Sequence, residues 1–149
     1  MKGNMMEWGL TIPKLINFAE ENFADNTFVS RSADGSLKSY KYGHSLQNSR
    51  KIAGFLKNKI GINLTDRVAT IAWNDSYHLE TYFAAIGMGA VLHTINPRLF
   101  PEQLIYIINH AEDKVVFIDP LFLPLMEGVY SKLDRKIPII VFTEEEISS

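Results

Sequence analysis

Cysteine is absent from the 149 residues of the sequence. This absence excludes disulfides, thiolate metal sites and cysteine nucleophiles, and it fits a reducing compartment. Long hydrophobic runs are also missing: the most apolar window, VVFIDPLFLPLM from Val115, contains an aspartate and two prolines and is shorter than the roughly 20 residues of a membrane helix. The residues before Trp8 lack the apolar core of a secretory signal. We therefore expect a cytoplasmic protein without a transmembrane segment.

Basic charge is likewise not concentrated in any part of the chain. The formal net charge is −2 and the 15 lysines and arginines are scattered, so nucleic acid is not an expected partner. What the sequence does have is an ordinary globular composition, with 46% hydrophobic and 21% charged residues. A chain of this length buries roughly 70% of its unfolded surface, so we expect one compact unit.

The first 42 residues predict a helix followed by a small β hairpin. Residues 11–23 carry Thr11 as a candidate N-cap, Pro13 in the first turn and apolar residues at helical spacing. Asp34-Gly35 then separates two short β-prone segments and supplies the positive φ that a tight hairpin turn needs.

Residues 43–142 alternate between helix and strand patterns. Amphipathic spacing predicts a first helix that closes near Gly61. The strands that follow are apolar throughout and are joined by helices, which predicts a mostly parallel, doubly wound α/β sheet with helices on both faces. The expected strands are 67–73, 90–95, 114–118 and 137–142, and the expected helices are 75–86, 101–111 beginning at Pro101, and 121–133 interrupted by Pro124. Residues 143–149 are a polar, acidic tail, linker or helix start.

The segment GMGAVLHTINPRL, residues 87–99, contains two closely spaced glycines. A dinucleotide fingerprint requires a strand before the glycines and a helix after them, whereas the order here is reversed. We therefore interpret Gly87 and Gly89 as the end of a helix at Ile86.

Motifs for other chemistry are missing from the sequence, which lacks GxxxxGK[ST] and GxSxG. His78, His93 and His110 lack metal-ligand spacing, so no metal site is expected.

Polar residues follow the predicted strands, and open parallel sheets bind ligands beyond the carboxyl ends of their strands. We favour helix capping for Asn74 or Asp75 and for Asp119. Asn96 before Pro97 is a turn signal. The positions considered are Asn74, Asp75, Thr94, Asn96, Arg98, Asp119 and Thr143.

Arg98 is the one of these residues that neither a cap nor a turn explains. A buried or interface salt bridge is the alternative to ligand binding. We take Thr94, Asn96 and Arg98 as scaffold or pocket-rim candidates, and we assign no residue to catalysis, to a cofactor or to a metal.

The stretch DRVATIAWNDSYHLETYFAAIGMGAVLHTINPRLFPEQLIYIINHAEDKVVFID, Asp66 to Asp119, resembles the N-terminal region of adenylate-forming acyl-CoA synthetases, in the fatty-acid-CoA ligase branch. The upstream segment YKYGHSLQNSRKIAGFL is similar to the opening Thr-Tyr-x-Glu-Leu segment of that family. It departs from the family pattern at Ser45, where an acid usually stands, and at Thr65, where a glycine is common. We expect these departures to affect local capping.

The resemblance implies an enzyme that joins ATP and a fatty acid into an acyl-adenylate, with magnesium, and then transfers the acyl group to coenzyme A. The phosphate loop, the Tyr-Gly-x-Thr-Glu segment, the ribose-binding aspartate, the hinge and the lid of the family would lie beyond Ser149. We therefore expect residues 1–149 to be an N-terminal α/β subdomain that binds no cofactor and is inactive alone, with the remainder of its own enzyme as partner.

Two alternatives stay open. The first is a stand-alone, non-catalytic α/β binding or interaction module. The second is a flavodoxin-like regulatory domain with Asp119 as its chemical residue, although the acidic cluster of such magnesium sites is missing. A subdomain without its neighbours is expected to expose an apolar patch and to self-associate, with a homodimer as the simplest product.

Overall fold

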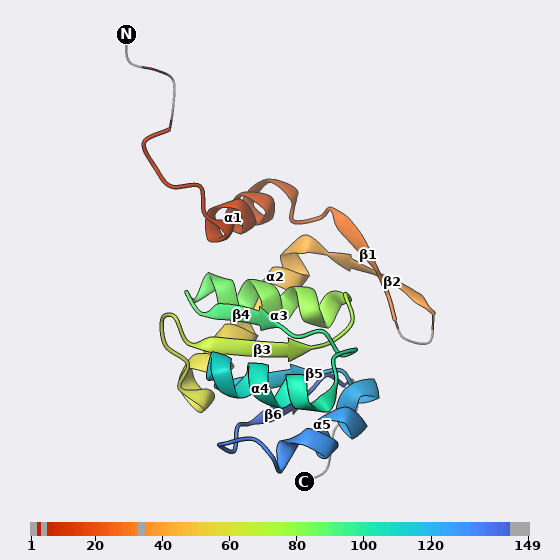
Figure 1. Cartoon of the computed structure of the whole chain (residues 1–149). Coiled ribbons are helices and arrows are strands. Elements are labelled where there is room, and N and C mark those ends of the chain that lie inside the picture. The colour runs from red at the N-terminus through yellow and green to blue at the C-terminus, as the bar shows by residue number, and fades with distance from the viewer. Residues whose placement is uncertain (1–2, 4–5, 33–34, 144–149) are drawn as a thin grey trace.

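The computed structural model describes residue 3 and residues 6–32 and 35–143, and its centre is an all-parallel sheet (Figure 1). The strand order is β4-β3-β5-β6. The expected parallel α/β sheet is confirmed, although every strand is shorter than its apolar pattern. The strands are β3 (Arg67–Ile71), β4 (Val91–Thr94), β5 (Val115–Ile118) and β6 (Ile139–Val141).

Helices cover both faces of the sheet, as the doubly wound pattern predicts. Side chains alternate along each strand, so Val68 and Phe117 pack on one face while Ala69 and Val116 pack on the other. One face is covered by α2 (Tyr42–Phe55), the π-helical turn η1 (Leu56–Ile60) and α3 (Ser76–Gly87), and the other by α4 (Pro101–Ala111), the 3-10 turn η2 (Pro120–Phe122) and α5 (Leu123–Tyr130). Full burial of each such apolar side chain stabilises the fold by roughly 1.5–3 kcal/mol.

The N-terminal part of the chain lies against the α2 and α3 side of the molecule, away from α4 and α5 (Figure 1). It consists of α1 (Ile12–Phe23) and an antiparallel hairpin of β1 (Thr27–Arg31) and β2 (Leu37–Lys41). Thr11 is the N-cap residue of α1, as the sequence predicts, although its side chain makes no cap hydrogen bond. Asp34 of the expected turn lies outside the described residues, while Gly35 has the positive φ of 86° that the turn requires.

Two helix ends differ from the sequence expectation. Pro124 does not interrupt a helix: it stands in the first turn of α5, where a missing N–H costs nothing. Helix α3 continues to Gly87, one residue beyond the expected end at Ile86. Gly89 then turns the chain with φ of 82°, and a Cβ on this residue would approach Leu64 Cδ1 to 2.5 Å. Gly89 therefore has the turning role that the sequence predicts, whereas Gly87 is the last residue of the helix.

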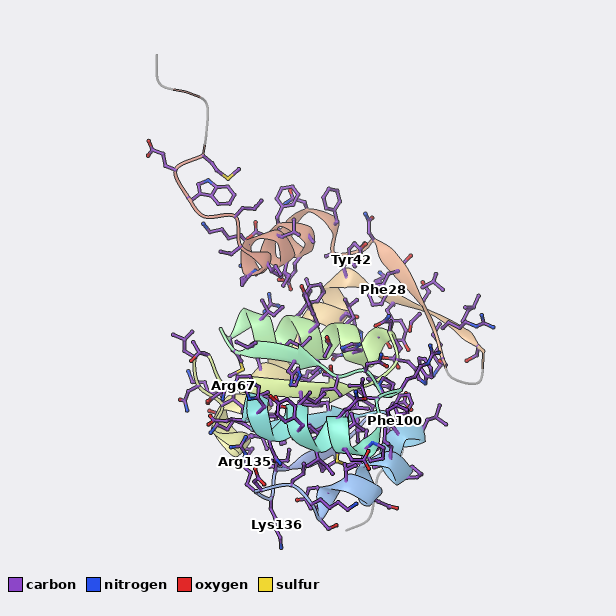
Figure 2. The ribbon with its side chains drawn as sticks, in the orientation of Figure 1. Phe28, Tyr42, Arg67, Phe100, Arg135 and Lys136 are labelled. Atoms are coloured by element: carbon purple, nitrogen blue, oxygen red, sulfur yellow. The ribbon has the colours of Figure 1, made fainter. Side chains whose placement is uncertain are left out.

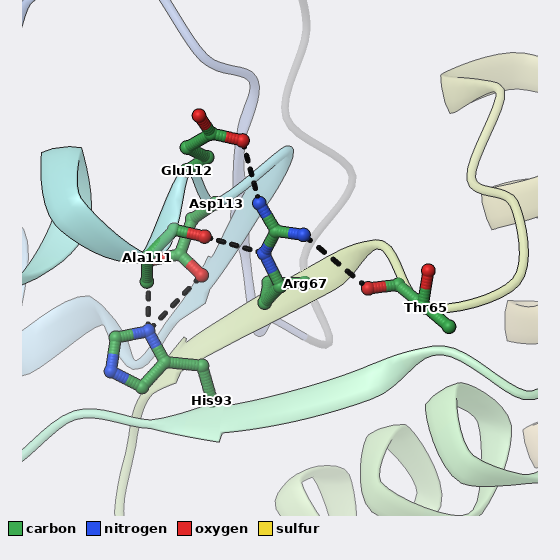
Figure 3. Close-up of polar contacts among 6 residues, drawn as sticks. All are labelled: Thr65, Arg67, His93, Ala111, Glu112 and Asp113. Carbon is green, nitrogen blue, oxygen red and sulfur yellow. Dashed lines mark hydrogen bonds and ion pairs between the residues drawn. The ribbon is translucent and has the colours of Figure 1, made fainter.

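A polar cluster joins the sheet to the end of α4 (Figure 3). His93 Nδ1 lies 2.9 Å from a carboxylate oxygen of Asp113, which is fully buried. Arg67 donates to the carbonyl of Ala111 and, at 2.8 Å, to the carboxylate of Glu112. His93 therefore has a structural partner that fixes the edge strand β4 to the loop between α4 and β5.

No helix in the described part of the chain is long and apolar enough to cross a membrane. Residues 144–149 of the expected tail lie outside the described residues.

Candidate functional site at the carboxyl ends of the strands

A pocket of about 340 Å³ opens where β3 and β4 end. Because both strands are parallel, their carboxyl ends lie at the same edge of the sheet. Figure 2 shows Phe100, two residues after Arg98, at the opposite end of the molecule from Arg67 and Arg135. We call this feature the strand-end pocket; its polar lining residues are Thr70, Asn74, His78, Thr94, Asn96 and Arg98. The three pocket-rim candidates from the sequence, Thr94, Asn96 and Arg98, thus line the same pocket.

The turn after β4 holds Asn96 and Arg98 at the rim of the strand-end pocket. The Asn96 side-chain oxygen accepts a hydrogen bond of 2.9 Å from the Arg98 backbone N–H, so the asparagine fixes the turn that its position predicts. Arg98 is exposed, and no ion pair or hydrogen bond of its guanidinium is found within the described residues. The buried salt bridge considered for Arg98 is therefore wrong for this part of the chain.

His78 forms the floor of the strand-end pocket together with Thr70. The imidazole Nε2 lies 3.1 Å from the Thr70 hydroxyl, which is almost completely buried in β3. Burial lowers the pKa of His78, while Asp75 and a hydrogen bond to the Trp73 carbonyl partly oppose this effect. The ring is therefore neutral at pH 7 and contributes a polar but uncharged surface.

The remaining strand-end residues have other roles. Asp75 caps α3 by accepting from the His78 backbone N–H at 2.9 Å, and Asp119 caps η2 by accepting from Leu121 at 2.9 Å. Both capping expectations are confirmed, and Asn74 does not cap the helix. Thr143 is exposed, just beyond β6.

Ligands of doubly wound sheets often bind at the topological switch point, which is the place where the strand order reverses. In this sheet the switch point lies between β3 and β5, because β4 is added on one side of β3 and β5 on the other. The rings of Trp73 and Phe122 occupy this position, with their centroids 5.4 Å apart. The open pocket lies one strand further along the sheet, between β3 and β4. Trp73 also lines the strand-end pocket, so the aromatic pair forms the side of the pocket that faces the switch point.

Sequence reasoning missed the role of His78, which it considered only as a metal ligand. A usable signal was present, because Thr70 is a hydroxyl residue within an apolar strand and His78 lies in the first turn of the helix that follows. A buried hydroxyl needs a hydrogen-bond partner, and the neighbouring helix supplies it.

The arrangement is suited to binding more than to proton transfer. The strand-end pocket presents one cation, two amide side chains and a neutral imidazole. Such a set recognises an anionic or polar group. Among residues 3, 6–32 and 35–143, no group of three or more His, Asp or Glu is placed to hold a metal ion.

Comparison with known proteins decides the family. The AMP-binding enzyme family model matches residues 17–147. The chain belongs to the AMP-binding enzyme family. It is 46% identical over 133 residues to the 3-methylmercaptopropionyl-CoA ligase of Ruegeria lacuscaerulensis. The aligned region covers 89% of this chain and 24% of that protein.

Other members of the AMP-binding family agree with this assignment. The long-chain-fatty-acid–CoA ligase of Thermus thermophilus is 41% identical over 141 residues, which is 95% of this chain and 26% of that enzyme. The chain therefore spans about a quarter of the length of the curated relatives it matches. Both relatives are named as CoA ligases, so the chain is related to acyl-CoA ligases within the AMP-binding family.

Solved structures show the same fold at low identity. An anthranilate CoA ligase in complex with anthranoyl-AMP superposes with a TM-score of 0.81 at 19% identity, over 95% of this chain and 27% of that one. A fatty acyl CoA synthetase of Mycobacterium tuberculosis gives 0.78 at 19% identity, over 89% of this chain and 26% of that one.

Proposed function

We propose that residues 1–149 form the N-terminal α/β subdomain of a fatty-acid–CoA ligase, with the remainder of that enzyme as partner. The observation that carries the proposal is the family match over residues 17–147, together with 41% identity to a long-chain-fatty-acid–CoA ligase. The substrates named for the relatives differ, so a carboxylic acid is the common class and a fatty acid is the finer proposal.

The whole enzyme would use ATP, magnesium and coenzyme A. Its reaction joins the carboxylate to AMP with release of pyrophosphate, and the thiol of coenzyme A then displaces AMP. The described residues do not fit magnesium, because they contain no cluster of carboxylates. We therefore assign no step of the chemistry to this chain and propose that it does not turn over alone.

The chain's own contribution is a binding surface. Arg98 lines the strand-end pocket, and no partner of its guanidinium is found in the part of the chain that the structure describes; a guanidinium matches the geometry of phosphate oxygens. The amides of Asn74 and Asn96 and the hydroxyl of Thr94 lie beside it as neutral hydrogen-bonding groups. We propose that this rim receives a phosphate group, and both ATP and coenzyme A carry that chemistry.

The test is a titration of the purified 149-residue chain with coenzyme A, ATP and inorganic pyrophosphate at low salt, followed by the amide NMR signals of residues 94–100. Arg98→Ala is expected to weaken binding about tenfold, because a charge-assisted contact contributes on the order of 1.4 kcal/mol. Arg135→Ala is the matched control, since Arg135 is also exposed but lies at the other end of the sheet (Figure 2). Equal loss in both variants would show only diffuse attraction to basic charge.

The ligand that binds most tightly identifies the source of the phosphate. A separate sample of the chain with ATP, octanoate, coenzyme A and magnesium, and without added pyrophosphate, is expected to release no pyrophosphate above the blank. Release of pyrophosphate that depends on the chain would contradict the proposal that it does not turn over alone.

A further inference from the structure

The amino ends of the parallel strands form the edge of the sheet opposite the strand-end pocket. A segment of chain leads into each of β3, β5 and β6, and these segments meet at one edge because the three strands are parallel. Figure 2 shows Arg67 and Arg135 at this end of the molecule and Phe100 at the other. We call this feature the amino-end surface, and its segments are residues 56–67, 112–114 and 131–138.

Positive charge gathers on the amino-end surface, although the basic residues are scattered along the sequence. The three segments hold seven of the 15 lysines and arginines of the chain but four of its 17 aspartates and glutamates. Two of these acids already have partners, since Asp113 is buried against His93 and Glu112 pairs with Arg67. The other six cations are exposed and form no ion pair within the described residues: Lys57, Lys59, Lys114, Lys132, Arg135 and Lys136.

Structural roles within the chain account for only part of this charge. Lys57 and Lys59 lie in the last turn of η1, where the helix dipole favours a cation. Lys114 and Lys136 instead lie in the loops just before β5 and β6, at neighbouring positions of the sheet edge. Like charges placed side by side repel each other, and an anionic partner removes that cost. The amino-end surface is therefore suited to a partner with many negative charges.

Two exposed apolar side chains beside these cations indicate which anionic partner fits. Leu64 is 73% exposed in the turn between η1 and β3, and Phe55 is 42% exposed at the end of α2. A lipid surface accommodates both kinds of group, because its anionic head groups attract lysine and arginine while apolar side chains enter the acyl boundary. A nucleic acid offers nothing to Leu64, and the three segments contain no tyrosine or tryptophan on which bases could stack.

We propose that the amino-end surface binds the anionic face of a lipid bilayer, with its lysines and arginines on the head groups and Leu64 inserted between them. The protein then lies on the membrane without spanning it. In this orientation the strand-end pocket opens on the side away from the lipid, because it lies at the opposite edge of the sheet. This proposal does not rest on the ligase function.

The experiment measures cosedimentation of the 149-residue chain with vesicles made of equal parts phosphatidylserine and phosphatidylcholine. Binding is expected to be roughly tenfold or more stronger than to phosphatidylcholine alone. Lys114→Gln/Lys136→Gln is expected to weaken binding about 25-fold, because each cation near an anionic bilayer contributes about fivefold. Lys14→Gln/Arg31→Gln is the matched control: it removes the same charge from exposed positions of α1 and β1 and is expected to lose about twofold at most.

Two further arms separate a lipid surface from other partners. Leu64→Ser is expected to weaken vesicle binding about threefold or more, because an inserted apolar side chain is lost. Unchanged binding of this variant would overturn the lipid as partner. Duplex DNA at the same phosphate concentration is expected to displace little of the chain from the vesicles, and complete displacement would assign the surface to nucleic acid instead.

The vesicle comparison also tests whether other surfaces of the chain are responsible. Equal binding to both kinds of vesicle would show attachment through apolar side chains elsewhere and would overturn the proposal. An equal loss in the two double variants would do the same, because it would show that only the net charge matters. Unfolding midpoints equal to that of the unmodified chain are expected for all three variants, since every substituted side chain is exposed.

Discussion

At the scale of single residues, Thr65 has an unusual backbone conformation. Its φ is 68°, and its side chain is exposed in the turn between η1 and β3. A left-handed conformation costs an L-residue roughly 1–2 kcal/mol, whereas glycine adopts it freely. This conformation is suited to glycine, the residue that the resemblance to acyl-CoA synthetases implies at this position. The departure at Thr65 therefore affects a turn, and the departure at Ser45 a buried helix face, so the expectation that they affect capping was wrong.

Thr65→Gly is expected to raise the free energy of unfolding by about 0.5–1 kcal/mol. The gain is smaller than the strain removed, because glycine increases the entropy of the unfolded chain. Urea denaturation followed by circular dichroism measures the change. Thr65→Ala is the control: it keeps the φ penalty and is expected to give little or no gain. A glycine variant no more stable than the alanine variant would show that Thr65 carries no strain.

The residues that the sequence predicted correctly act on their neighbours along the chain. Asp75, Asn96 and Asp119 each accept a backbone N–H two or three residues ahead, so their positions relative to a turn or helix start are sufficient to predict them. For Ser45 no such local signal exists, and for His78 the signal lies in Thr70, eight residues earlier in the chain. Their environments depend on β3 and on α1, elements that only the tertiary structure brings to them.

At the scale of elements, the contact between α2 and α3 contains a buried acid. Glu80 of α3 is 6% exposed and accepts a hydrogen bond from Asn48 of α2. Burial raises its pKa, and hydrogen bonds from Asn48 and Ser45 oppose part of this increase. The folded chain consequently retains this proton to higher pH than the unfolded chain, whose glutamates ionise near about pH 4.3. Stability must then fall as pH rises from that value through the folded pKa.

Glu80→Gln is expected to remove this loss, so the variant gains stability relative to the unmodified chain as pH increases from about 4.3 toward 8. Urea unfolding at several pH values measures the difference. Glu20→Gln gives the opposite sign, because the hydrogen bond to Arg50 of α2 lowers the pKa of Glu20. Glu20→Gln is therefore expected to be less stable than the unmodified chain at neutral pH, and this difference in the free energy of unfolding shrinks as the pH falls and Glu20 is protonated. Parallel curves for Glu80→Gln and the unmodified chain would contradict the assignment.

Element boundaries show a limit of pattern reading. Apolar runs predicted each strand of the parallel sheet, because strands buried on both faces are apolar throughout. The same apolar character continues into neighbouring turns such as Ala72 and Trp73, so the pattern alone overestimated strand length. Pro124 was misread for a related reason, since apolar residues on both sides of it gave no sign of where α5 begins.

At the scale of the whole molecule, exposed apolar side chains are concentrated near the N-terminus. Leu15 and Phe18 of α1 are 62% and 55% exposed, and Val29 and Leu37 of the hairpin are 64% and 70% exposed. Apolar surface gathered in this way is typical of an interaction site. The expected partner is the remainder of the enzyme, and without it we expect two copies to associate through this surface.

Sedimentation equilibrium is expected to show an average mass that rises above 16.9 kDa with concentration. Phe18→Ser is expected to reduce this association, because it removes an aromatic side chain from the exposed face of α1. Phe100→Ser serves as control, since Phe100 is 73% exposed on the strand-end side of the molecule. A mass of 16.9 kDa at every concentration, or equal effects of both substitutions, would refute the role of this surface.

The strand order has a consequence for how the protein is made. β3 is the first strand of the parallel sheet to be synthesised, β4 and β5 then pair with β3, and β6 pairs with β5. Each strand that leaves the ribosome after β3 therefore finds its neighbour already translated. Translation adds about 5–20 residues per second, so each strand of this sheet can pair with a strand that the ribosome has already released.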